Sequence, residues 1–184
     1  MIDTIVARVK GFFLEPVETF RQSKNDEPRA VFTYFGALLL FYAVISSLVN
    51  AVFGTGGAVG IVADLIMTVI GGFIGMLVFA AWVHLWVYIV GGREGIMQTV
   101  NALFYGSTPG LLLGWIPYVG IIFSLWSLVL YVLGVRELQG ISTARAVIAV
   151  AVAVIIPLVL IALFAAWFMT SSMIFVPVPQ GSAI

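Results

Sequence analysis

The fold is decided by residues 61–90, IVADLIMTVIGGFIGMLVFAAWVHLWVYIV, which precede the short polar segment GGREG at residues 91–95. Asp64 and His84 are the only side chains in this run that carry a carboxylate or an imidazole. A helix needs about 20 mainly apolar residues to cross the hydrocarbon core of a bilayer. This run is longer, so it predicts a membrane-crossing helix that tilts or projects beyond the bilayer.

The whole chain has the composition of an integral membrane protein. Of its 184 residues, 62% are hydrophobic and 9% are charged, whereas a soluble domain carries about 25% charged residues. The net charge is zero and no dense basic cluster is present, which excludes nucleic-acid binding. Cysteine is absent, which excludes disulfides, thiolate metal sites and cysteine nucleophiles. With a single histidine as well, no metal or cofactor is expected.

Five apolar runs are long enough to cross a bilayer as helices. They are too long and continuous for barrel strands, and only helices and closed barrels satisfy their own backbone in lipid. We therefore predict an all-α integral membrane protein, a five-helix bundle, with a cytoplasmic segment at residues 1–30 and an external tail at residues 170–184. The predicted crossings are residues 31–53, 61–90, 96–113, 118–133 and 144–169.

All eight basic residues lie on one side of these predicted crossings. Lys and Arg are retained on the cytoplasmic side of membranes. We therefore expect the N-terminus inside the cell and the C-terminus outside. The basic residues are Arg8, Lys10, Arg21, Lys24 and Arg29 before the first crossing, Arg93 after the second, and Arg136 and Arg145 between the fourth and fifth.

Residues 2–13, IDTIVARVKGFF, place apolar side chains such as Val9 and Phe12 on one face of a helix. Arg8 and Lys10 are assigned to other faces. The pattern is typical of an amphipathic helix that lies in the headgroup plane. A terminal helix that packs under the bundle would show the same pattern, and the two interpretations are compatible.

The third predicted crossing carries the largest group of intramembrane polar residues. Pro109 lacks an amide hydrogen and leaves the carbonyl of Tyr105 without its helical partner. A hydroxyl group or a water molecule could donate to that carbonyl. The segment is then either a kink capped by its own hydroxyls or a broken helix of the kind that lines substrate sites in transporters. Its candidate residues are Asn101, Tyr105, Ser107, Thr108 and Pro109.

Asp64 and His84 are the remaining intramembrane candidates. Ionisable groups inside a membrane are candidates for function by default. Twenty residues of helix separate the two side chains by about 30 Å, so they cannot pair. In the simpler interpretation, Asp64 reaches water and His84 forms a hydrogen bond to a neighbouring helix.

A second candidate site lies among the cytoplasmic charges. These residues could anchor helix ends to lipid phosphates, or form a recognition face for a soluble protein or an anionic lipid. The members are Arg8, Lys10, Arg93, Glu94, Arg136, Glu137 and Arg145. Small residues recur at every fourth position at Ala102, Gly106, Gly110 and Gly114, which favours close helix packing within the bundle or in a homo-oligomer.

Several short motifs, in their order and spacing, resemble the Yip1 domain family. They are Pro16-x-Glu-Thr-Phe20, Tyr105-Gly-Ser-Thr-Pro109, residues 117–120 followed by Trp126, Gly134-x-Arg-Glu137 and Ile141-Ser-x-x-Arg-Ala146. The resemblance implies five crossings and a cytoplasmic N-terminus. Eukaryotic relatives act in vesicle traffic and associate with Rab-type GTPases and with one another. With about 30 residues before its first crossing, this chain is similar to compact prokaryotic members of the family.

No catalytic motif is present, and the predicted aqueous loops are too short for an enzyme site. The first functional hypothesis is a non-enzymatic scaffold or membrane-organising protein in a prokaryotic cell membrane, with lipids and a cytoplasmic protein as its partners. Removal of residues 1–15 is then expected to abolish association and to leave the bundle folded. The alternative hypothesis is a small transporter or channel for an ion or a lipid that uses the broken third helix.

Overall fold

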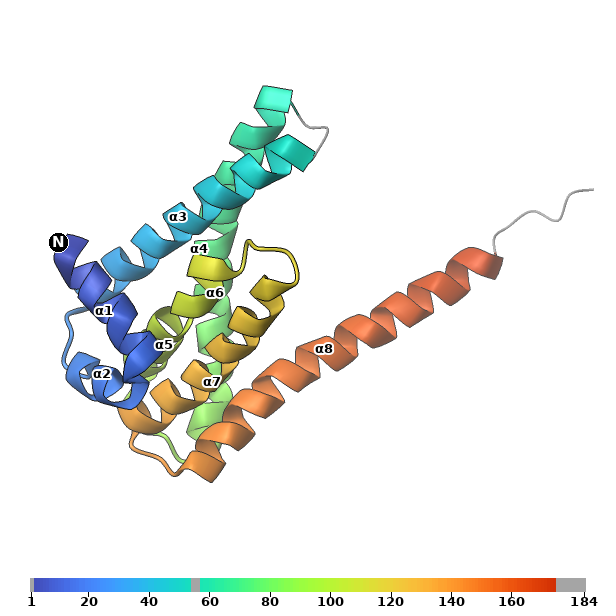
Figure 1. Ribbon diagram of the computed structural model, residues 1–184. Helices are drawn as coiled ribbons and strands as arrows, with labels where there is room; N and C mark the ends of the chain where they lie inside the picture. The colour runs from blue at the N-terminus through green and yellow to red at the C-terminus, as the bar shows by residue number, and fades with distance from the viewer. Residues whose placement is uncertain (1, 54–56, 175–184) are drawn as a thin grey trace, which may run out of the picture.

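The computed structural model describes residues 2–53 and 57–174, which form eight helices and no strands (Figure 1). The first two helices are short and lie at one side of the bundle. The remaining helices form one bundle. The elements are α1 (Ile2–Leu14), α2 (Pro16–Ser23), α3 (Pro28–Phe53), α4 (Gly57–Ile89), α5 (Ile96–Gly106), α6 (Thr108–Leu113), α7 (Val119–Gln139) and α8 (Thr143–Ile174).

Four helices of the described residues are long and apolar enough to cross a membrane, which identifies a multi-pass membrane protein. They cover Pro28–Val52, Val59–Ile89, Val119–Gln139 and Thr143–Ser171. The predicted third crossing is divided between α5, with 11 residues, and α6, with 6 residues. Neither half is long enough to span a bilayer alone, so a crossing at this place would need both halves.

The divided helix lies at the centre of the bundle. Every residue of α5 from Thr99 to Gly106 is buried, and α5 packs against α3, α4 and α7. Close approach to α7 depends on small residues, because a Cβ at Gly106 would lie 2.7 Å from the ring of Tyr131. The α6 half continues this contact, since a Cβ at Gly110 would lie 3.1 Å from Ser127 Oγ. This stripe of small residues therefore packs inside the bundle.

The N-terminal helices contribute to the same core. Phe12 of α1 and Phe20 of α2 are fully buried, with ring centroids 4.8 Å apart. Phe12 also stacks on Tyr105 of α5 at 5.1 Å, and Phe20 fills the space left by Gly134 of α7. The helix at residues 2–14 therefore packs under the bundle. This packing argues against the expectation that residues 1–15 can be removed without loss of the fold, because their removal would expose the rings that Phe12 covers.

The connection predicted between the fourth and fifth crossings is shorter than expected. α7 continues to Gln139, where Gly140 adopts the left-handed conformation (φ +62°) that often ends a helix. Arg136 and Glu137 therefore lie on the last turns of α7. At the other end of α8, the helix reaches Ile174 and includes the first residues assigned to the tail. The rest of the predicted tail, 175–184, lies outside the described residues.

α8 contains Pro157, which leaves the carbonyl of Ala153 without its helical partner. The structure supplies a substitute, because the indole N–H of Trp82 on α4 donates to Ala153 O at 2.9 Å. Beyond this point α8 separates from the other helices (Figure 1), and its apolar side chains from Leu158 to Met169 are exposed. In a membrane, this half of α8 would face lipid or another protein.

The packing predicts opposite effects for two glycine-to-alanine substitutions. Gly106→Ala should lower the free energy of unfolding by about 1–3 kcal/mol, because the added methyl overlaps Tyr131 in a close-packed contact. Gly75→Ala is the matched control, since a Cβ there meets nothing within 4 Å and alanine favours the helix by up to about 1 kcal/mol. Unfolding by SDS in mixed micelles measures both. Equal stabilities for the two variants would contradict the packing.

Candidate functional site

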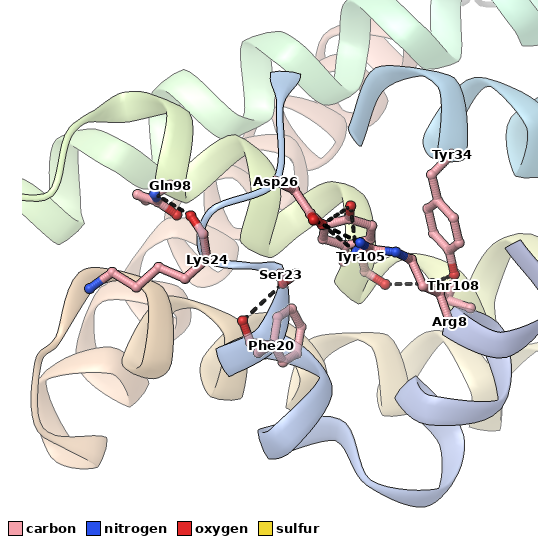
Figure 2. Close-up of polar contacts among 9 residues, drawn as sticks. All are labelled: Arg8, Phe20, Ser23, Lys24, Asp26, Tyr34, Gln98, Tyr105 and Thr108. Carbon is pink, nitrogen blue, oxygen red and sulfur yellow. Dashed lines mark hydrogen bonds and ion pairs between the residues drawn. The ribbon is translucent and has the colours of Figure 1, made fainter. Parts of the chain in front are cut away.

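A polar cluster joins the N-terminal segment to the divided helix (Figure 2). We call it the docking cluster, and it consists of Arg8, Asp26, Tyr34, Tyr105 and Thr108. Arg8 Nη2 donates to Asp26 Oδ1 at 2.7 Å, and Nη1 donates to Asp26 Oδ2. Arg8 Nη1 also donates to the Tyr105 hydroxyl at 2.8 Å, and that hydroxyl donates to Asp26 Oδ2 at 2.6 Å. The three side chains thus form a closed ring of hydrogen bonds.

Helical spacing explains how an arginine reaches this position. Residues four apart lie on the same face of a helix, so Arg8 projects beside Phe12. While Phe12 stacks on Tyr105, the Arg8 guanidinium carbon lies 5.1 Å from the centroid of the same ring. Arg8 was expected on another face than Phe12, and the structure instead places both side chains against the same ring. Asp26 is held by the turn between α2 and α3, where its amide donates to Ser23 O at 3.1 Å.

The second half of the docking cluster caps the helix break. Thr108 Oγ1 donates to Tyr105 O at 2.5 Å, which satisfies the carbonyl that Pro109 leaves open. A threonine hydroxyl has one hydrogen, so in the 2.9 Å contact with Tyr34 the tyrosine hydroxyl is the donor. Ser107 Oγ donates in turn to Phe104 O at 2.8 Å. The structure therefore confirms a kink that is capped by its own hydroxyls.

The charge of Arg8 is compatible with this half-buried position. Burial alone lowers the pKa of Arg8, but the hydrogen bond to Asp26 and the electrostatic interactions with Tyr105 and Asp26 raise it above its usual value. Arg8 therefore stays charged at every pH at which the protein would be studied. Removing one partner of a buried ion pair is far more destabilising than exchanging both, because it leaves the other charge unpaired.

A second polar cluster joins the C-terminal ends of α4 and α7 to the N-terminal end of α5. Gln139 Nε2 donates to Gly95 O at 2.8 Å and to Thr99 Oγ1 at 3.0 Å, and Gln139 Oε1 accepts from the Glu94 amide at 3.1 Å. His84 Nδ1 lies 2.8 Å from the same Thr99 hydroxyl. This confirms the hydrogen bond predicted from His84 to a neighbouring helix. Gln139 was not singled out from the sequence, although it directly precedes the glycine that ends α7.

The other intramembrane candidates do not meet the docking cluster. Asp64 accepts a 2.7 Å hydrogen bond from Ser47, which joins α4 to α3. Asn101 is 1% exposed, and its Oδ1 has no hydrogen-bond partner in the part of the chain that the structure describes. Asp64, His84 and Asn101 therefore occupy separate places and do not form one site.

The predicted cytoplasmic charges divide into two groups. Some pair within the protein: Arg21 Nε donates to Glu137 at 2.9 Å, Arg136 pairs with the same carboxylate, and Lys24 Nζ lies 3.7 Å from Glu94. Others pair with no acid among residues 2–53 and 57–174. The members of this second group are Arg93, whose guanidinium carbon lies 3.8 Å from the centroid of the Tyr88 ring, and the exposed Lys10, Arg29 and Arg145.

The docking cluster predicts strong energetic coupling between α1 and the turn before α3. In a double-mutant cycle of Arg8→Ala and Asp26→Ala, the interaction energy should be about 1–3 kcal/mol, because the pair is part-buried and shares Tyr105. The matched control is Glu18 with Gln22, an exposed pair on α2, whose coupling should be within error of zero. SDS titration in mixed micelles gives all the required values. Additive effects of the Arg8 and Asp26 substitutions would contradict the geometry.

Comparison with known proteins identifies the family of the chain. No curated protein and no solved structure matches the chain. Among protein families, the Yip1 domain matches residues 10–177. This match includes the end of α1, the turn that carries Asp26, the divided helix and all of α8. The chain therefore belongs to the Yip1 domain family.

Proposed function

We propose that the protein is a non-enzymatic scaffold with five membrane crossings, a cytoplasmic N-terminus and an external C-terminus. One observation carries this proposal: the N-terminal segment is joined by ion pairs to the inner ends of the bundle. Arg21 of α2 pairs with Glu137 of α7, and Lys24 contacts both Glu94 and, through its carbonyl, Gln98 of α5 at 3.0 Å. Segments distant in sequence thereby form one charged surface on the side where the basic residues gather.

We call this surface the α2–α7 face, and its members are Glu18, Arg21, Gln22, Lys24, Glu94, Arg136 and Glu137. Contacts within it already order the side chains, so a partner would bind without an added ordering cost. Both signs of charge are present, which suits a protein partner with a complementary pattern. A binding role for this face accounts for a charged surface on a chain with few charges elsewhere.

The α2–α7 face can be tested without disturbing the core. Gln22→Trp places a bulky side chain on the exposed side of α2, where the present residue makes only a 3.1 Å hydrogen bond to Glu18. The variant should fold normally. The amount of the protein that co-purifies stoichiometrically in mild detergent should fall at least tenfold, which corresponds to about 1.4 kcal/mol of binding free energy. Quantitative mass spectrometry of the purified material measures this loss.

The control is Tyr118→Trp, a substitution of an 88% exposed residue at the opposite end of the bundle, which should retain the partner. Retention of the partner by Gln22→Trp would refute binding at this face. Wild-type protein that purifies without any stoichiometric partner would refute the scaffold proposal as a whole.

The five crossings can be tested because the chain has no cysteine. Tyr118 precedes α7 and lies outside the cell only if α5 and α6 together cross the membrane. A membrane-impermeant maleimide added to intact cells should label Tyr118→Cys, and should label Gln22→Cys only after permeabilisation. If Tyr118→Cys also requires permeabilisation, α5 and α6 fold back within the membrane and the number of crossings is four.

A second candidate function, transport, is supported by one cavity of about 280 Å³ on the α7 side of the helix break. Its polar lining includes hydroxyl groups of Ser107, Ser127 and Tyr131. The docking cluster weakens this proposal, because Tyr105 and Thr108 are already satisfied by hydrogen bonds to protein groups. Flux of ions or lipids in proteoliposomes that falls on Thr108→Val would favour transport, and no flux would dismiss it.

A further inference from the structure

A separate pocket of about 320 Å³ lies between α1 and the first turns of α3. We call it the α1–α3 pocket. Its polar lining comes from Thr4 and Arg8 on α1 and from Glu27, Arg29 and Thr33 at the start of α3, while Ile5 and Ala30 give an apolar wall. Apart from Arg8, none of these residues was selected as a site from the sequence. The pocket shares Arg8 and Tyr34 with the docking cluster, on whose outer side it opens.

The depth of the pocket favours a lipid. α3 begins at Pro28 and is one of the helices long enough to cross the membrane, so its first two turns lie where headgroups meet hydrocarbon. A pocket with charged groups at one end and aliphatic groups on its wall suits an amphiphile at this level. A small water-soluble anion would gain nothing from the contacts with Ile5 and Ala30.

The charges of the pocket are unusual because they do not neutralise one another. Arg29 and Glu27 line the same pocket, yet neither forms an ion pair with the other or with any residue in the described part of the chain. Arg8 is already neutralised by Asp26. The pocket therefore offers one available cation and one available carboxylate within the same lining.

This pair of charges discriminates among phospholipid headgroups. A guanidinium binds the phosphate group, which all phospholipids share. The carboxylate of Glu27 would accept hydrogen bonds from a primary ammonium, whereas a quaternary ammonium has no hydrogen to donate. An anionic headgroup such as phosphatidylglycerol would meet the Glu27 carboxylate without a compensating positive charge.

We propose that the α1–α3 pocket binds a phospholipid with a primary ammonium headgroup, phosphatidylethanolamine, with its phosphate on Arg29 and its ammonium on Glu27. Thr4 is available as a further hydrogen-bond donor to the phosphate. Thr33 is not, because its hydroxyl donates to Arg29 O at 2.7 Å. The lipid would lie against α1 and α3 together and so would bind only the docked arrangement of the N-terminal segment. This inference is independent of whether the α2–α7 face binds a protein.

Native mass spectrometry of the delipidated full chain tests the proposal. Phosphatidylethanolamine, phosphatidylcholine and phosphatidylglycerol with the same acyl chains are titrated separately. The wild type should bind phosphatidylethanolamine about tenfold more tightly than either of the others. Glu27→Gln should abolish this preference, and Arg29→Gln should weaken the binding of all three lipids. Equal binding of the three lipids by the wild type, or an unchanged preference in Glu27→Gln, would overturn the proposal.

Matched controls separate the pocket from general surface charge. Lys10→Gln and Glu15→Gln remove one charge each from exposed positions that do not line the pocket, and both should behave as the wild type. Glu27→Gln and Arg29→Gln should keep the wild-type stability, since neither residue forms an ion pair within the described chain. Free phosphoethanolamine should not displace the lipid at equal concentration. Displacement by the free headgroup would show a site for a soluble phosphate and would overturn the assignment to a lipid.

Discussion

An open backbone carbonyl at the centre of the bundle constrains the rest of this structure. Pro109 divides the third apolar run, and a carbonyl without a hydrogen-bond donor is costly inside a membrane. Thr108 satisfies the carbonyl of Tyr105, and Tyr34 donates to Thr108 from α3. Because the break must be shielded from lipid by protein, the surrounding helices are held close to it, and the small residues of α5 and α6 make that closeness possible.

The same break explains why the N-terminal segment is part of the bundle. Tyr105 presents its hydroxyl and its ring toward the N-terminal segment, where Asp26 accepts from the hydroxyl, Arg8 donates to it, and Phe12 covers the ring. One tyrosine thus connects the backbone of the divided helix to α1 and to the turn before α3. Because the N-terminal segment is held against the bundle in this way, its exposed charges have fixed positions. A binding role would require such fixed positions.

Much of the architecture could be predicted because hydrophobic runs and proline chemistry are local properties of a sequence. The apolar helices, the break before Pro109 and its hydroxyl caps follow from neighbouring residues. Partners distant in the chain could not be predicted in this way. Apart from its position before the first predicted crossing, nothing in the sequence marked Asp26 as a partner of Arg8 and Tyr105. Arg8 was expected on another face than Phe12, although the two residues are four apart and so share one face of the helix.

The most direct test of this account is amide hydrogen exchange of the protein in lipid nanodiscs, with the wild type compared with Tyr105→Phe. Loss of the Tyr105 hydroxyl removes hydrogen bonds to both Arg8 and Asp26. Protection should fall together in α1 and in residues 24–27, while the half of α8 that precedes Pro157 keeps its protection. Unchanged exchange in α1 would show that the docking cluster does not hold the N-terminal segment, and would contradict the account.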